Sequence, residues 1–139
     1  MKIITEQIEV DTVGFSDIKD VTSQVAEIVR KHKMKDGTVT VFVPGATAGV
    51  TTIEFEPGLQ RDFPLLFERL APEDMKYHHD MTWHDGNGFS HVRASLLGPS
   101  LTVPFADGKL TLGTWQQIIL VDFDNKPRRR RIVIQAMGE

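Results

Sequence analysis

The chain has 139 residues, a formal net charge of −3 and no cysteine. This length fits one domain, and 40% hydrophobic with 25% charged residues is ordinary for a globular fold. The lack of cysteine excludes thiol nucleophiles, iron–sulfur clusters and thiolate zinc sites, and it suits a reducing compartment, so we expect a cytoplasmic location.

Neither a membrane nor a nucleic acid is an expected partner. No apolar run approaches the ~18 residues that span a bilayer, and the first residues alternate as in a strand rather than forming a signal peptide. The negative net charge argues against general nucleic-acid binding. The basic run Arg128–Arg131 lies between a turn and a strand, so we expect its side chains to point to different sides, in a solvated turn or a subunit contact.

The first part of the chain predicts a strand, a helix and two more strands. Residues 2–10 alternate loosely and predict a strand, and a helix is expected over about 20–34 with Asp20 or Thr22 as its cap. The apolar stripe of this helix has the spacing of one face and consists of Val21, Val25, Ile28 and Val29. The segments 38–43 and 50–55 are rich in β-branched residues and predict strands.

A second helix is expected over roughly 59–71. Pro64 should lie in or near its first turn, with Asp62 as the cap, because a proline in the middle of a helix costs ~3 kcal/mol. Residues 73–89 are polar and show no clean period, which predicts a long loop, and loops of this length are usually functional or mobile.

Alternation returns after this loop and predicts a strand from Ser90. In that strand, Val92, Ala94 and Leu96 face one way, and His91, Arg93 and Ser95 face the other. An Asp-Gly hairpin turn follows at 106–109. The remaining strands are expected at 101–104, 110–112, 115–123 and 131–137. The fold class is therefore α+β: a single domain over 1–139, a mostly antiparallel β-sandwich with two packed helices.

Four of the five histidines fall within fourteen residues, at 78, 79, 84 and 91. Histidine is the commonest metal ligand and titrates near neutrality. His79, His84 and His91, with Asp80 or Asp85, can supply the nitrogen and oxygen ligands of an open catalytic metal site for a divalent ion such as Mg²⁺ or Zn²⁺. The alternative is that these are surface histidines gathered by chance.

Other residues suit a small phosphorylated metabolite. One face of the predicted strand would carry a base or ligand (His91), a cation (Arg93) and a hydroxyl (Ser95). Alternatively, Arg93 simply pairs with a carboxylate. Glu54 and Asp85 are candidate general bases, and Glu54 can equally be an exposed edge residue. Glycine-rich loops bring further polar groups near an anion. The candidate phosphate-binding residues are Thr47, Asn87, Ser95 and Ser100.

Several blocks of the sequence resemble one family over essentially the whole chain. They are Arg93-Ala94-Ser95-Leu96-Leu97-Gly98-Pro99-Ser100, Leu101-Thr102-Val103-Pro104, Asp107-Gly108-Lys109-Leu110 and Leu112-Gly113-Thr114-Trp115-Gln116. These blocks identify the chain as similar to the YjbQ-like family, whose members are assigned as secondary thiamine-phosphate synthases. The resemblance implies a YjbQ-like fold and a homotrimer with sites near subunit boundaries. It also implies a reaction that joins hydroxymethylpyrimidine diphosphate to thiazole phosphate, with Arg93 holding phosphate oxygens and a divalent metal on the leaving diphosphate.

The chain departs from that family pattern at two positions. Many relatives carry His-Thr-Ser/Thr-Ala where this chain has Gly45-Ala46-Thr47-Ala48, and relatives often carry a second histidine where it has Phe89. His79 and His84 are the candidate replacements. Two alternatives stay open: a trimeric metal- or metabolite-binding protein without catalysis, which fits the missing histidines, and a metal-dependent phosphohydrolase with Glu54 or Asp85 as its base.

Overall fold

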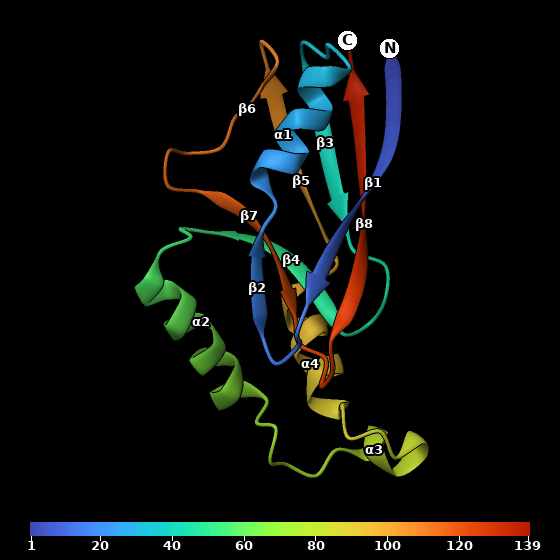
Figure 1. The fold of residues 1–139 in the computed structure, drawn as a ribbon, viewed down its shortest axis with the longest axis vertical. Coiled ribbons are helices and arrows are strands. Elements are labelled where there is room, and N and C mark those ends of the chain that lie inside the picture. Colours follow the sequence, from blue (N-terminus) through green and yellow to red (C-terminus); the bar gives the residue numbers. More distant parts are fainter.

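The computed structural model describes residues 1–139 and consists of antiparallel strands with helices packed against them (Figure 1). The strands are β1 (Lys2–Thr12), β2 (Asp17–Asp20), β3 (Gly37–Phe42), β4 (Ala48–Ile53), β5 (Ser100–Ala106), β6 (Lys109–Leu110), β7 (Gln117–Asp122) and β8 (Arg128–Gly138). The helices are α1 (Thr22–Lys31), α2 (Pro57–Leu70), α3 (His78–Trp83) and α4 (Gly88–Leu97). The predicted α+β class is confirmed, with four helices in place of two.

The strands form two antiparallel sheets. The larger sheet has the order β1-β8-β3-β5-β6, and the smaller one has the order β2-β7-β4. The first and last strands of the chain pair along their whole length, from Lys2 opposite Gly138 to Thr12 opposite Arg128. Both termini consequently lie at the same end of the molecule, and α3 and α4 lie toward the opposite end (Figure 1).

Strand β7 is buried on both faces because a core cluster lies on each side of the smaller sheet. Ile118 and Leu120 belong to the large cluster, which includes the side chains of α1 and the larger sheet. Ile119 and Val121 face the other way and pack with Phe67 of α2 in the second cluster. The continuous apolar run of β7 is typical of such a two-sided strand.

Helix α1 follows its predicted apolar face. Val25, Ile28 and Val29 are its buried residues, and Val21 just before it is fully buried as well. The N-cap is Val21, so the predicted cap at Asp20 or Thr22 is wrong, although the carboxylate of Asp20 accepts a hydrogen bond from the backbone N–H of Thr22. The short strand β2 precedes this helix in a segment that is too polar and too short to carry a period-two signal.

Helix α2 corrects the predicted position of Pro64. The helix begins at Pro57, whose missing N–H costs nothing at this position, and the Glu56 side chain accepts from the N–H groups of Gly58 and Leu59. The predicted cap at Asp62 is therefore wrong, and Pro64 lies inside the helix. Because Pro64 has no N–H, it leaves one carbonyl of this largely exposed helix to water.

The segment from 73 to 97 contains the largest correction. The predicted loop contains α3, and the predicted strand after Ser90 is instead the helix α4. Its buried residues follow the helical spacing, whereas Val92 and Leu96, which were predicted to share a face with the buried Ala94, are 42% and 59% exposed. The expected shared face of His91, Arg93 and Ser95 is wrong, because residues two apart on a helix point in different directions.

The four arginines at 128–131 point to different sides, as predicted. Arg130 is buried against Asp122, whereas the exposed Arg129 pairs with Glu9 and Asp11 across the larger sheet. None of the helices is both long and apolar enough to cross a bilayer.

Candidate functional site

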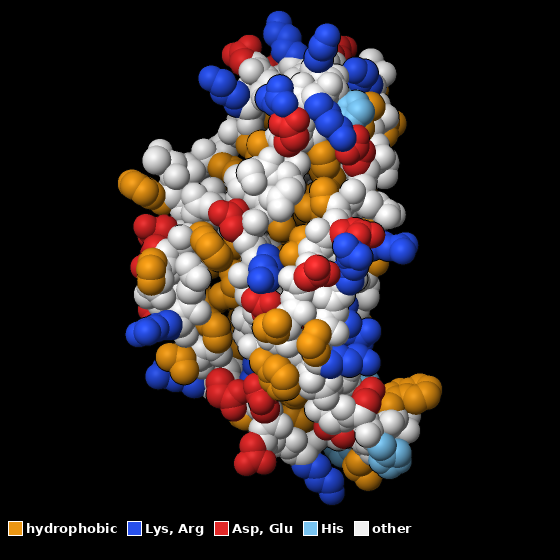
Figure 2. Space-filling view, viewed as in Figure 1, with side chains coloured by type: hydrophobic (Ala, Val, Ile, Leu, Met, Phe, Trp, Pro, Cys, Tyr) orange, Lys and Arg blue, Asp and Glu red, His pale blue; other side chains and the backbone are white.

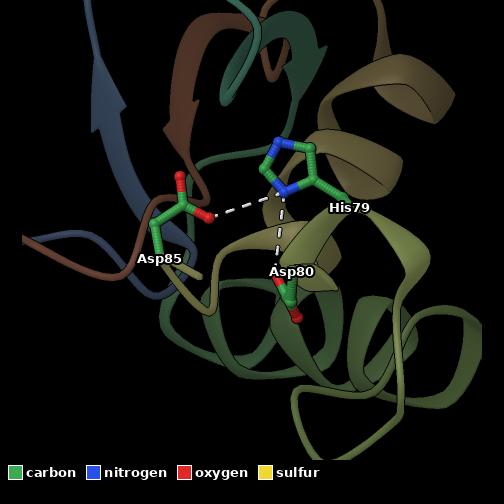
Figure 3. Close-up of side chains that lie close together, drawn as sticks. All are labelled: His79, Asp80 and Asp85. Carbon is green, nitrogen blue, oxygen red and sulfur yellow. Dashed lines mark ion pairs between the residues drawn. The ribbon is translucent and has the colours of Figure 1, made fainter. Parts of the chain in front are cut away.

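The side chains of His79, Asp80 and Asp85 converge at the end of the molecule that carries α3. The Nδ1 atom of His79 lies 3.5 Å from Oδ1 of Asp80 and 3.6 Å from Oδ1 of Asp85. Figure 3 shows the imidazole nitrogen facing both carboxylates. One donor atom from each of the three residues lies within 4.8 Å of the others. We call these three residues the His-Asp-Asp cluster.

Local backbone geometry brings the cluster together. Helix α3 ends at His84, whose left-handed conformation (φ 57°) turns the chain back, and Gly86 also has a positive φ. This turn of the backbone places the side chain of Asp85 close to that of His79. The backbone N–H of Gly88 donates to Oδ1 of Asp80 at 2.9 Å, which ties α4 to the cluster. A side chain at position 88 would not fit, since its Cβ would lie 2.5 Å from Cβ of Tyr77.

His91 lies directly beside the cluster. It is in the first turn of α4, and its ring centroid is 4.1 Å from that of His79 with an interplanar angle of 37°. Burial lowers the pKa of His91, and a positive charge on His79 lowers that pKa further, while Asp85, Asp124 and Asp80 act in the opposite direction. His91 is therefore neutral at neutral pH and has a nitrogen lone pair free to accept a proton.

Asp124 is the centre of a buried polar network behind the cluster. It is fully buried, and its carboxylate accepts from Arg128, Thr47 and the side-chain amide of Asn87. Burial alone would raise the pKa of Asp124, but these hydrogen bonds and that of the Asn125 backbone N–H outweigh it and lower the pKa to about 2. Asp124 is thus ionised throughout the physiological range.

This pKa predicts a specific acid sensitivity. A carboxyl whose pKa falls from 3.8 to about 2 on folding stabilises the native state above pH ~4 and loses that contribution as the pH falls toward 2. We expect the contribution to be about 2 kcal/mol. Urea unfolding at several pH values should show a smaller loss of stability below pH 4 for Asp124→Asn than for the wild type. Equal pH dependence of the two proteins would contradict the role of Asp124.

The His-Asp-Asp cluster has the donor chemistry of a divalent-cation site. Separations of 3.5 and 3.6 Å are close to those between two ligands of one ion at bonds of about 2 Å. His79 Nδ1 is also one of only two buried side-chain polar atoms in the chain without a hydrogen-bond partner. An unpaired buried nitrogen costs free energy, and a bound cation would remove that cost. The residues present therefore fit a divalent ion.

Several residues expected at the site lie elsewhere. His84 is exposed and does not belong to the cluster, so the structure does not bring the three predicted histidine ligands together. Glu54 is exposed just after β4 and forms no ion pair, which agrees with its reading as an exposed edge residue. Ser95 donates to the backbone carbonyl of His91 on the exposed side of α4, and Ser100 is exposed at the start of β5.

Arg93 is buried on the other side of α4, with 2% of its surface exposed. Its guanidinium donates to the carbonyl of Ala71, to Oγ of Ser16 and to the carboxylate of Glu68, and it lies 4.9 Å from the ring centroid of Phe89. All three nitrogens are therefore engaged within the fold. The simpler reading of Arg93, as the partner of a carboxylate, is the one that the structure supports.

Two candidate phosphate-binding residues join the site through the buried network. Thr47 donates to Asp124 and accepts from Arg130, and Asn87 donates to Asp124. Asp122 and Asp124 were not among the predicted site residues. The available signal in the sequence was two aspartates at the end of the apolar run Ile118–Val121, followed after a short turn by arginines.

Comparisons with known proteins agree on one family. A family model described as UPF0047 protein YjbQ-like matches residues 6–139. A UPF0047 protein of Archaeoglobus fulgidus is 40% identical over 121 residues, which cover 87% of this chain and 91% of that protein. One from Mycobacterium tuberculosis is 39% identical over 128 residues, covering 92% and 93%.

Solved structures show the same likeness. The crystal structure of a YbjQ-like protein of unknown function from Sulfolobus solfataricus matches with a TM-score of 0.94 and 33% identity, over 99% of each chain. A hypothetical protein from Aeropyrum pernix matches with a TM-score of 0.91 and 32% identity, over 98% of this chain and 99% of that one.

Proposed function

The chain belongs to the YjbQ-like UPF0047 family, and we propose that it is a divalent-cation-dependent enzyme that acts on a small diphosphorylated metabolite. The observation that carries the proposal is the His-Asp-Asp cluster, in which one unpaired buried imidazole nitrogen faces two carboxylates (Figure 3). The candidate reaction is the one implied by the resemblance, in which hydroxymethylpyrimidine diphosphate and thiazole phosphate form thiamine phosphate.

The proposed roles follow from the positions of the side chains. His79, Asp80 and Asp85 would hold the ion, and the Gly88 N–H fixes the Asp80 carboxylate. When bound, the ion supplies positive charge to the oxygens of the leaving diphosphate. His91, in contact with His79, can donate a hydrogen bond from its ring N–H to the oxygens of the leaving diphosphate. In this reaction a carbon–nitrogen bond forms as the carbon–oxygen bond to diphosphate breaks.

An assay of the purified chain tests this reaction. With Mg²⁺ or Mn²⁺ and both substrates, we expect thiamine phosphate and pyrophosphate to form in equal amounts, and a chelator to stop their formation. His91→Ala should lower the rate by about 10²-fold or more, the usual cost of removing one hydrogen-bond donor to charge that develops in the transition state. The exposed His78→Ala is the matched control and should leave the rate unchanged. No product with either ion, or no loss on His91→Ala, would contradict the proposed reaction.

A second candidate is a cation-dependent binding protein without catalysis. The observation that favours it is that three arginines are paired with carboxylates of the fold and are not free to bind a phosphate: Arg93, Arg128 and Arg130. Binding of the cation and of a diphosphate ligand without turnover would support this candidate over the enzyme.

The assembly proposed from the resemblance is a homotrimer. What supports association is the apolar surface of α2, where Leu65, Leu66 and Leu70 are 57%, 47% and 58% exposed, together with Trp115, which is 72% exposed. Apolar side chains are visible over α2 in Figure 2. Exposed apolar patches of this kind mark contacts between proteins. We also propose a cytoplasmic location, which is supported by the absence of cysteine.

A further inference from the structure

Asn87 has an unexplained side-chain oxygen. Only 7% of the surface of Asn87 is exposed to solvent, and its Oδ1 atom has no hydrogen-bond partner. Across the whole chain only one other buried side-chain polar atom lacks a partner, and it is Nδ1 of His79 in the His-Asp-Asp cluster. A buried amide oxygen without a partner costs about 1–3 kcal/mol, so its retention calls for an explanation.

The orientation of the Asn87 amide is fixed by its neighbour. The side-chain nitrogen lies 3.3 Å from Oδ1 of Asp124. Asp124 forms an ion pair with Arg128 at 2.7 Å and is therefore a carboxylate, which can only accept hydrogen bonds. The NH₂ group of Asn87 must consequently face Asp124. A rotated amide would set two oxygens against each other, and so Oδ1 is directed away from Asp124.

The backbone places Asn87 within the cluster segment. It lies two residues after Asp85, and it directly precedes Gly88, whose N–H donates to Asp80. Asn125, the residue after Asp124, donates its side-chain N–H to the backbone carbonyl of Asp85 at 2.8 Å. The loop that carries Asp85 and Asn87 is thus held on both sides by the Asp124 network.

We propose that Oδ1 of Asn87 is a fourth contact of the cation, and that the site is built for a hard divalent ion such as Mg²⁺ or Mn²⁺. The inference rests on the cation site proposed above. With Asn87 the donor set is one imidazole nitrogen, two carboxylates and one amide oxygen, and oxygen-dominated sets suit Mg²⁺ and Mn²⁺. One ion would satisfy both unpaired buried atoms. The Asp124 network would then orient this oxygen without binding the ion itself.

Two variants distinguish the role of the Asn87 side-chain oxygen from that of its NH₂ group. Asn87→Ala removes both. The double variant Asn87→Asp with Asp124→Asn keeps an oxygen at position 87 without setting two carboxylates against each other, because the amide introduced at position 124 can donate the hydrogen bond in the reverse direction. Titration calorimetry with Mn²⁺ should show that Asn87→Ala weakens binding by about 10-fold or more and that the double variant binds at least as tightly as the wild type. Thr12→Val is the matched control, because it removes a hydrogen bond to Asp122 in the same buried network while Thr12 forms no hydrogen bond to the cluster, and its affinity should stay within about 2-fold.

The outcomes distinguish this inference from the cation site itself. If the wild type binds Mn²⁺ and Asn87→Ala binds equally well, or if both Asn87 variants lose affinity equally, the role of Oδ1 is overturned while the His-Asp-Asp site stands. If the wild type binds no Mn²⁺, both are overturned. Should circular dichroism show that Asn87→Ala does not fold, the double variant decides alone, and a 10-fold loss of its affinity would overturn the inference.

Discussion

Replacing Asp122 by alanine is expected to lower the free energy of unfolding by about 3–5 kcal/mol, the usual cost of removing one partner of a buried ion pair. The Asp122 carboxylate is fully buried and binds Arg130 through two hydrogen bonds, from Nε at 2.7 Å and from Nη2 at 2.9 Å. It also accepts from the hydroxyl of Thr12 at 2.6 Å. The variant would leave the buried Arg130 cation without its bidentate partner.

Two comparison variants sharpen this experiment. Arg129→Ala on the same strand removes a pair in which Arg129 is 70% and Glu9 is 50% exposed, so it should cost no more than about 1 kcal/mol. The double variant Asp122→Ala with Arg130→Met removes both charges and should recover part of the loss. Urea unfolding measures all three, and a cost for Asp122→Ala as small as that for Arg129→Ala would contradict the buried-pair account.

The second large effect is on cation affinity. Changing Asp80 and Asp85 together to asparagine should weaken Mn²⁺ binding by at least about 10²-fold, because both negative charges of the site are lost. Asparagine keeps an oxygen that can accept the hydrogen bond of the Gly88 N–H, so the fold should survive. Asp74→Asn is the matched control, since Asp74 is exposed in the same segment and lies outside the cluster.

Calorimetry and thermal unfolding together test this prediction. The wild type and Asp74→Asn should both gain thermal stability when Mn²⁺ is added, as expected for an ion that binds the native state, whereas the double variant should gain none. If the double variant gains as much as the wild type, the ion binds elsewhere and the His-Asp-Asp cluster is not its site.

The parts of the fold that follow local patterns were predictable. Helix α1 shows one clean apolar stripe, with Val25 and Ile28 in the core, and β7 shows an unbroken apolar run. Helix α4 was not predictable in this way, because its buried face carries Arg93 and Ser90 among the apolar residues while Val92 and Leu96 point to solvent. A buried arginine masks the helical period, and the remaining residues imitate the alternation of a strand.

The candidate site was predictable only in part. His79 and Asp85 were singled out because histidines and aspartates gather in one short segment, and that segment does fold on itself. The supporting residues Asp124 and Arg130 come from the other end of the chain, and their contact with Thr47 depends on the pairing of β4 with β7. Local sequence carries no information on such strand pairing. It also does not show that the Arg93 side chain points away from the cluster and pairs with Glu68.

Diffraction from crystals grown with Mn²⁺ tests the central claim most directly. Anomalous scattering should reveal one ion per chain within about 2.0–2.3 Å of Nδ1 of His79 and of a carboxylate oxygen of both Asp80 and Asp85. An ion found at another place, or no ion beside His79 at a saturating Mn²⁺ concentration, would contradict the assignment of this cluster as the metal centre of the protein.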